Sequence, residues 1–90
     1  MNLSNFLKDT RNKWVKVNVN EGYTIIQKVE NYDLVGNKGY FKCQGKSYSN
    51  CGGDIVELDE FYMTSSHLNG TVHNLNDEDV ENEVKKMREN

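Results

Sequence analysis

The sequence predicts a mainly β domain: a small five-stranded antiparallel barrel with a short helix before it and a second helix after it. Valines alternate with polar residues from position 14, so that Val15, Val17 and Val19 share one face of an extended strand. Gly22 then allows the chain to reverse, and a second run rich in Ile and Val follows at once. This order is typical of a β-hairpin, which is the first unit of the predicted sheet.

Five strand candidates follow one another, separated at each break by Asn, Asp or Gly, at residues 14–19, 23–32, 38–43, 46–51 and 54–62. Five short strands with no helix between them indicate an antiparallel barrel or a strongly bent sheet. A chain of 90 residues is long enough for one domain with one small core. We expect most of that core to come from apolar strand residues, namely Val15, Val17, Ile25, Val29, Phe41, Ile55, Val56 and Leu58.

The predicted helix before the barrel covers residues 3–13, with Ser4 as its N-cap. It is too short to be stable alone, so Leu3, Phe6 or Leu7 should close one end of the barrel. Residues 1–63 therefore form the helix and the barrel.

Residues 64–75 are predicted to be a linker, with a loose final strand as the alternative. Residues 76–90 contain an acidic helix capped by Asn76, with acids in its first turn and bases in its last, which complements the helix dipole. Its thin apolar stripe of Val80, Val84 and Met87 leaves open whether it packs on its own barrel or on another chain.

The charge balance argues against a protein that binds nucleic acid by neutralising phosphates. Eleven basic residues stand against 14 acidic ones, for a net charge of −3. Six of the acids lie in the last helix, so the rest of the chain is close to neutral. Nucleic-acid binders of that type gather several Lys or Arg on one face.

The start of the chain has neither the basic region nor the apolar stretch of a signal peptide, and no segment reaches membrane-spanning length. We therefore expect a cytoplasmic protein in which Cys43 and Cys51 are reduced. The chain has 13 Asn and nine Lys but no Ala and no Pro. Such usage is typical of AT-rich genomes, which favours a low-GC bacterium, or a phage or mobile element living in one.

Neither a metal site nor a catalytic site is predicted, and no cofactor is expected. Cys43, Cys51, His67 and His73 are zinc-ligand types, but seven residues separate the two cysteines where zinc motifs have two to four. Cys51, a histidine and Asp54 lack the local signature of a nucleophilic triad. The Gly-rich segments 36–39 and 51–53 do not open helices, so they are predicted to be turns rather than phosphate loops.

A resemblance to the Sm-like (LSm) small-barrel family covers about residues 3–58. A short helix, a strand, and a bent strand that opens at Gly22 and ends in Tyr32-Asp33 match the first motif of that family. Its central hydrophobic positions fall on Ile25 and Val29, and its base-stacking Asn falls on Asn37. The second motif is matched in outline by residues 51–58. Other SH3-like barrels begin with a similar hairpin.

The resemblance implies an RNA-binding or regulatory module, with Asp33, Asn37 and Lys38 at the nucleic-acid site and with assembly of several copies left open. Cys51 replaces the Arg that helps to hold the base in the family, and Gln27 and Gly36 depart from the pattern as well. Because base recognition uses an aromatic or guanidinium plane, the loss of that Arg weakens the implied RNA site.

The function that the sequence favours is a non-catalytic binding protein that occupies the functional surface of another protein. Small size, AT-rich usage and an acidic helix able to mimic a row of phosphates favour a phage- or mobile-element-encoded inhibitor of a host defence or nucleic-acid-processing protein, in the manner of an anti-CRISPR protein. Exposed tyrosines are typical of protein interfaces. The expected partner-binding residues are Tyr48, Tyr62, Asp77, Glu78, Asp79 and Glu81.

Overall fold

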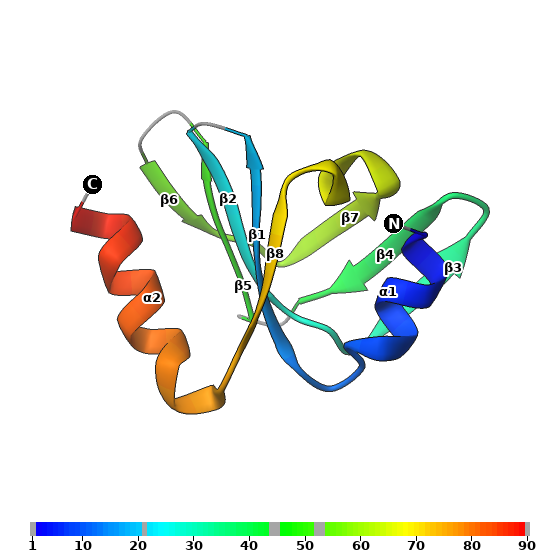
Figure 1. Cartoon of the computed structure of the whole chain (residues 1–90), viewed down its shortest axis with the longest axis horizontal. Helices are drawn as coiled ribbons and strands as arrows, with labels where there is room; N and C mark the ends of the chain where they lie inside the picture. Colours follow the sequence, from blue (N-terminus) through cyan, green and yellow to red (C-terminus); the bar gives the residue numbers. More distant parts are fainter. Residues whose placement is uncertain (1, 21, 44–45, 52–53, 90) are drawn as a thin grey trace.

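The computed structural model describes residues 2–20, 22–43, 46–51 and 54–89, with side chains outside 51–57 and 89 (Figure 1). The helices are α1 (Leu3–Asp9), the 3-10 helix η1 (Ser65–Asn69) and α2 (Asp77–Glu89). The strands are β1 (Trp14–Asn20), β2 (Tyr23–Lys28), β3 (Tyr32–Val35), β4 (Lys38–Lys42), β5 (Ser47–Cys51), β6 (Asp54–Glu57), β7 (Glu60–Thr64) and β8 (Thr71–Leu75).

These strands pair in two antiparallel sheets, one in the order β6-β5-β2-β1-β8 and one in the order β3-β4-β7. The mainly β class is confirmed, whereas a closed five-stranded barrel is not. Two of the predicted long strands are divided by bends, so that residues 23–32 form β2 and begin β3, and residues 54–62 form β6 and most of β7. At the first bend Asn31 takes a φ of 52°. The bend directs each half of the strand into a different sheet.

The hydrophobic core lies between the two sheets and is closed by α1 and η1. Val15, Val17, Ile25, Val29 and Phe41 are buried as predicted, and Leu3, Phe6 and Leu7 of α1 join them. Leu58 is half-buried, and the predicted core residues Ile55 and Val56 lie outside the described side chains. The core also contains residues that were not predicted, namely Cys43, Met63 and Leu68.

A buried polar side chain lies in the core wall at Gln27, which is fully enclosed. Its Oε1 accepts a hydrogen bond from the Ser47 hydroxyl at 2.6 Å, and its Nε2 donates to the Lys28 carbonyl at 3.0 Å. Because a buried amide is costly only when it lacks partners, the core tolerates Gln27 here.

The two segments before and after the predicted barrel differ from the prediction. The N-cap of α1 is Asn2 rather than Ser4, because the Asn2 side chain accepts a hydrogen bond from the Asn5 N–H at 3.2 Å. The helix ends at Asp9, four residues before the predicted end. Residues 64–75 are not a linker: after η1, β8 pairs with β1, with Val17 opposite Val72, so the alternative of a final strand is the observed one.

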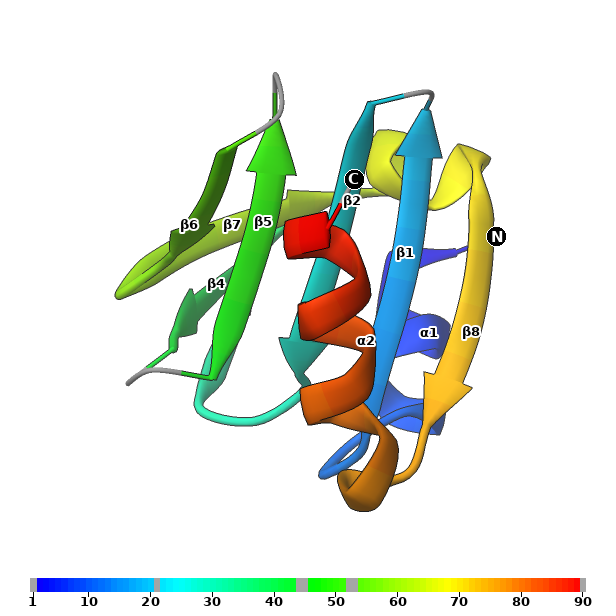
Figure 2. The ribbon, with the colours of Figure 1, turned by 90° about the vertical axis from the view of Figure 1, so that its left-hand side faces the viewer.

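The last helix packs on the outer face of the five-stranded sheet (Figure 2). Val80, Val84 and Met87 cover Ile26 of β2, with Trp14, Tyr48 and Leu75 packed around them. Lys16 of β1 donates to Glu83 at 2.9 Å, and Lys28 lies 3.7 Å from Asp77. The apolar stripe of α2 is therefore used within its own chain. In the part of the chain that the structure describes, no helix is long and apolar enough to cross a membrane.

Candidate functional site

The outward side of the three-stranded sheet carries two exposed tyrosines, and no other element among the described residues covers it. Strand alternation places one side chain in two on this side. We call it the tyrosine face, and it consists of Asp33, Val35, Lys38, Tyr40, Lys42, Glu60, Tyr62 and Thr64. Tyr40 is 46% exposed, Tyr62 is 51% exposed and Val35 is 63% exposed.

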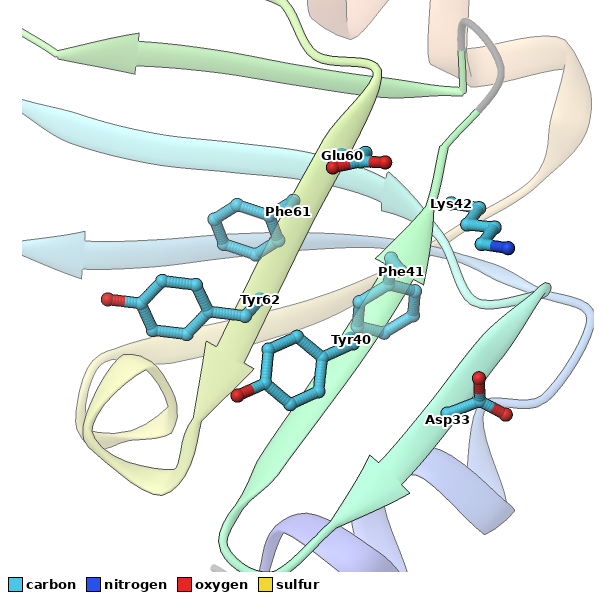
Figure 3. A pocket seen from close by; sticks show the side chains of 7 residues that line it. All are labelled: Asp33, Tyr40, Phe41, Lys42, Glu60, Phe61 and Tyr62. Carbon is cyan, nitrogen blue, oxygen red and sulfur yellow. The ribbon is translucent and has the colours of Figure 1, made fainter.

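Two tyrosines form the centre of this face (Figure 3). Tyr40 of β4 lies directly opposite Tyr62 of β7, with ring centroids 6.2 Å apart and planes inclined by 42°. The ammonium group of Lys38 lies 5.1 Å from the centroid of the Tyr62 ring, in a cation–π contact. Each tyrosine is thus held by a cross-strand contact while its hydroxyl end faces outward, which limits the entropy lost when a ligand covers it.

Charges of both signs surround the tyrosines. Asp33 lies opposite Tyr40 on β3, and Lys42 lies opposite Glu60 across β4 and β7. A hollow of about 490 Å³ lies among these side chains and the edges of Phe41 and Phe61. No described cation lies within ion-pair distance of Asp33. The face therefore offers aromatic area, a shallow hollow and an unpaired carboxylate.

A second aromatic pair lies on the other sheet, beside α2. Trp14 of β1 stacks on Tyr48 of β5, with ring centroids 6.4 Å apart and planes inclined by 25°. These rings form the floor of a groove of about 590 Å³ whose α2 wall carries charges of both signs, from Asp77, Glu81, Lys85 and Arg88. Both rings are half-buried because the helix covers their inner edges.

The structure divides the predicted partner-binding residues between these two surfaces. Tyr62 lies on the tyrosine face, whereas Tyr48 lies beside α2, on which Asp77, Glu78, Asp79 and Glu81 are exposed. Figure 1 shows α2 and the three-stranded sheet at opposite ends of the molecule. Tyr62 and the four acids therefore belong to two different surfaces.

The residues of the RNA hypothesis come partly together on the tyrosine face. Asp33 and Lys38 belong to it, and Asn37 is exposed in the turn between β3 and β4. Tyr40 was not singled out from the sequence, because aromatic residues in strands are usually core. The signal for it is the alternation over residues 38–42, which places Tyr40 on the same side as Lys38 and Lys42 and opposite to the buried Phe41.

The cysteines and histidines are dispersed. Cys43 is buried, His73 is exposed on β8, and the side chains of Cys51 and Asp54 lie outside the described set. Within the residues that the structure describes, no three of His, Cys, Asp and Glu gather as metal ligands would.

His67 has a structural environment of its own. Its ring lies edge-on to Tyr23 and Phe61, with centroid distances of 6.2 Å and 5.6 Å, and its Nδ1 accepts the Thr64 N–H at 3.0 Å. Burial lowers the pKa of His67 below its ordinary value of 6.5. The neutral imidazole is the form that holds the start of η1.

Comparison of the chain with protein-family models, with curated proteins and with solved structures finds no match.

Proposed function

We propose that this chain is a non-catalytic binding domain whose tyrosine face recognises a protein partner. The observation that carries the proposal is the pair Tyr40 and Tyr62, about half exposed, in mutual contact and fixed on rigid strands. Tyrosines held in this way are the side chains that most often dominate the energetics of protein interfaces.

The chemistry of the face favours a protein over RNA. Its two lysines are balanced by Asp33 and Glu60, and the whole chain has a net charge of −3. An RNA-binding face gains much of its affinity by neutralising phosphates, and this one has no net positive charge with which to do so. The exposed aliphatic side chain of Val35 adds apolar area suited to a protein surface.

A binding role also suits the openness of the face. Asp33, Lys42 and Glu60 are all exposed to solvent. Acid–base catalysis gains most from a desolvated cleft that shifts protonation equilibria, whereas these three side chains lie on an open face in contact with solvent.

The biological role that we propose is inhibition of a host defence or nucleic-acid-processing protein by a phage- or mobile-element-encoded product, as an anti-CRISPR protein does. Small size and AT-rich usage support this role. The acids of α2 support electrostatic steering towards a basic target, while the tyrosine face supplies the contact itself.

The test is affinity capture from a low-GC bacterial host with three forms of the tagged chain. The first is unchanged, the second carries Tyr40→Ser and Tyr62→Ser, and the third carries Glu78→Lys and Glu81→Lys as a matched control on the other surface. We expect the tyrosine variant to lose about 30-fold or more of its affinity for the dominant captured protein, because interface hot spots contribute about 2 kcal/mol or more. The α2 variant should change mainly the on-rate at low salt. Capture that survives the tyrosine changes and disappears with the α2 changes would contradict the proposal.

Single-stranded RNA, bound by an Sm-like or other SH3-like module, is the second candidate. It is favoured by the contact of Lys38 with Tyr62 beside a second exposed ring, since bases stack on such rings. Anisotropy titrations of a labelled oligonucleotide between about 50 and 200 mM salt separate the two candidates. Affinity that falls by orders of magnitude over this range would favour RNA.

A further inference from the structure

β3 is an edge strand with one side open. It ends the three-stranded sheet, and among the described strands it pairs with β4 alone. Leu34 is 42% exposed and Val35 is 63% exposed. Soluble proteins usually protect such edges with charged side chains, Lys above all, or with Pro, a bulge or a covering element. Of these features, β3 has only the charge of Asp33. An apolar, unprotected edge is a template for another strand.

The hydrogen-bond pattern shows which backbone groups point to the open side. Lys42 N–H donates to the Asn31 carbonyl at 3.0 Å, just beyond the Tyr32–Phe41 pair. Bonded and non-bonded pairs alternate in an antiparallel ladder, so Asp33 and Val35 bond to β4. The N–H and C=O groups of Tyr32 and Leu34 therefore point away from the sheet.

We propose that an extended segment of the protein partner adds to β3 as a fourth, antiparallel strand, with a basic residue opposite Asp33. This inference rests on the proposed function, because the added strand would extend the tyrosine face of the same sheet. Its backbone would pair with Tyr32 and Leu34, the two residues whose polar groups point to the open side.

Register fixes the side chains of this segment. The partner residues opposite Asp33 and Val35 would project over the tyrosine face. Asp33 has no described cation within ion-pair distance, so a Lys or Arg opposite it completes a favourable cross-strand pair. The residue opposite Leu34 would project to the other side, towards a hollow of about 420 Å³ lined in part by Leu3 and Leu34. From N- to C-terminus, the segment should read apolar, apolar, basic.

A second copy of this chain fits the edge less well. The two-fold register that uses both outward pairs sets Tyr32 opposite Leu34 of the second copy. That register places the two Asp33 carboxylates directly opposite each other, and like charges in such positions are destabilising. Charge complementarity therefore favours a different chain.

The probe is a blocked, fluorescein-labelled peptide, Ser-Val-Leu-Lys-Val-Ser, with its Lys in the position opposite Asp33. N-methylation of its Leu removes an N–H that faces β3, whereas N-methylation of its Lys removes one that faces solvent. We expect the first change to weaken binding at least tenfold and the second to change it less than twofold. Asp33→Lys should weaken binding about fivefold, and a peptide with Glu in place of Lys should restore it.

The whole chain provides a second measurement with the captured partner. Leu34→Pro removes one outward N–H without touching the ladder to β4, and Leu34→Ala is the control that keeps this N–H. Capture that needs Tyr40 and Tyr62 but tolerates Leu34→Pro would overturn strand addition while keeping the proposed function. Capture that tolerates the tyrosine changes would overturn the proposed function itself.

Three further results would overturn strand addition. One is failure of the peptide to bind at millimolar concentration, and another is equal binding of the two N-methylated peptides. The third is a dimer of this chain, seen by sedimentation, that Leu34→Pro converts to monomer, since the edge would then belong to a second copy.

Discussion

The outer faces of the two sheets have the same kind of surface, and the chain covers only one of them. Each face centres on an aromatic pair, Trp14 with Tyr48 on one sheet and Tyr40 with Tyr62 on the other, at centroid distances of 6.4 Å and 6.2 Å. On the first, α2 provides an apolar stripe that buries Ile26 completely. On the second, nothing in the described chain does so, and both tyrosines remain about half exposed. A covering helix thus removes one aromatic face from solvent, whereas the uncovered face remains accessible to a partner.

Removal of the cover should have the largest effect. Deleting residues 76–90 would expose Ile26 and the inner edges of Trp14 and Tyr48. We expect a loss of about 3 kcal/mol in the free energy of unfolding, after the entropy of ordering the helix is subtracted from the burial of its three apolar residues. Thermal melts should show a fall of roughly 15 °C. The matched change on the uncovered face, Tyr40→Ser with Tyr62→Ser, should cost under about 1 kcal/mol. Equal losses for the two would remove the distinction between the faces.

The shared core should be almost as sensitive. Val17 is fully buried between the sheets, so Val17→Ala should cost about 2 kcal/mol in denaturant melts. Val35 on the tyrosine face is 63% exposed, and Val35→Ala should change stability by less than about 0.5 kcal/mol. A loss for Val17→Ala no larger than that for Val35→Ala would contradict the placement of β1.

The surroundings of His67 and the last helix, α2, should respond to acid in different ranges of pH. Burial lowers the folded-state pKa of His67 below its ordinary value of 6.5, so the unfolded chain takes up the proton first. Stability is then complete above pH 6.5 and falls as the pH drops through the folded-state pKa. His67→Gln should flatten this part of a plot of stability against pH. A slope that persists just below pH 6.5 in the variant would assign it to another group.

The smallest effect concerns α2. The hydrogen bond from Lys16 lowers the pKa of Glu83 below its ordinary value of 4.5, with contributions from Lys86. Stability from this group is present above pH 4.5 and is lost as the pH falls through the lower, folded-state pKa. Glu83→Gln should reduce the acid sensitivity of α2, measured by helix circular dichroism, without moving the His67 range. Because Lys16 and Glu83 are partly solvated, we expect a shift of a few tenths of a kcal/mol.

The fold was predictable from the sequence wherever alternation was strong. β1 and the buried face of β2 follow directly from Val15, Val17 and Ile25, and the apolar stripe of α2 follows from Val80, Val84 and Met87. The division into two sheets was not predictable in this way, because it depends on the bend at Asn31, where a non-glycine residue takes a φ of 52°. β8 was difficult to recognise in the sequence because it has little apolar alternation: of its five residues, only Val72 and Leu75 are half-buried.

The candidate site could be predicted only in part. Tyr62 was chosen as an exposed interface residue, and its neighbours Asp33 and Lys38 came from the resemblance to the Sm-like family. Tyr40 was missed because a lone strand does not reveal which of its faces the rest of the chain will cover. The sequence shows which side chains share a face of a strand. Which of the two sheets α2 covers depends on tertiary packing, which the alternation of residues does not reveal.

The position of β1 in the five-stranded sheet also affects how the chain folds. β1 lies between β2 and β8, so one of its neighbours follows it directly in the chain and the other lies about fifty residues later. Such long-range pairing closes large loops and is slow to form. When residues 76–90 are not folded onto the sheet, Ile26 has no cover. The aromatic pairs of both sheets are then exposed at the same time. A partly folded chain in which α2 is not docked therefore exposes two aromatic faces, of which the folded protein exposes one.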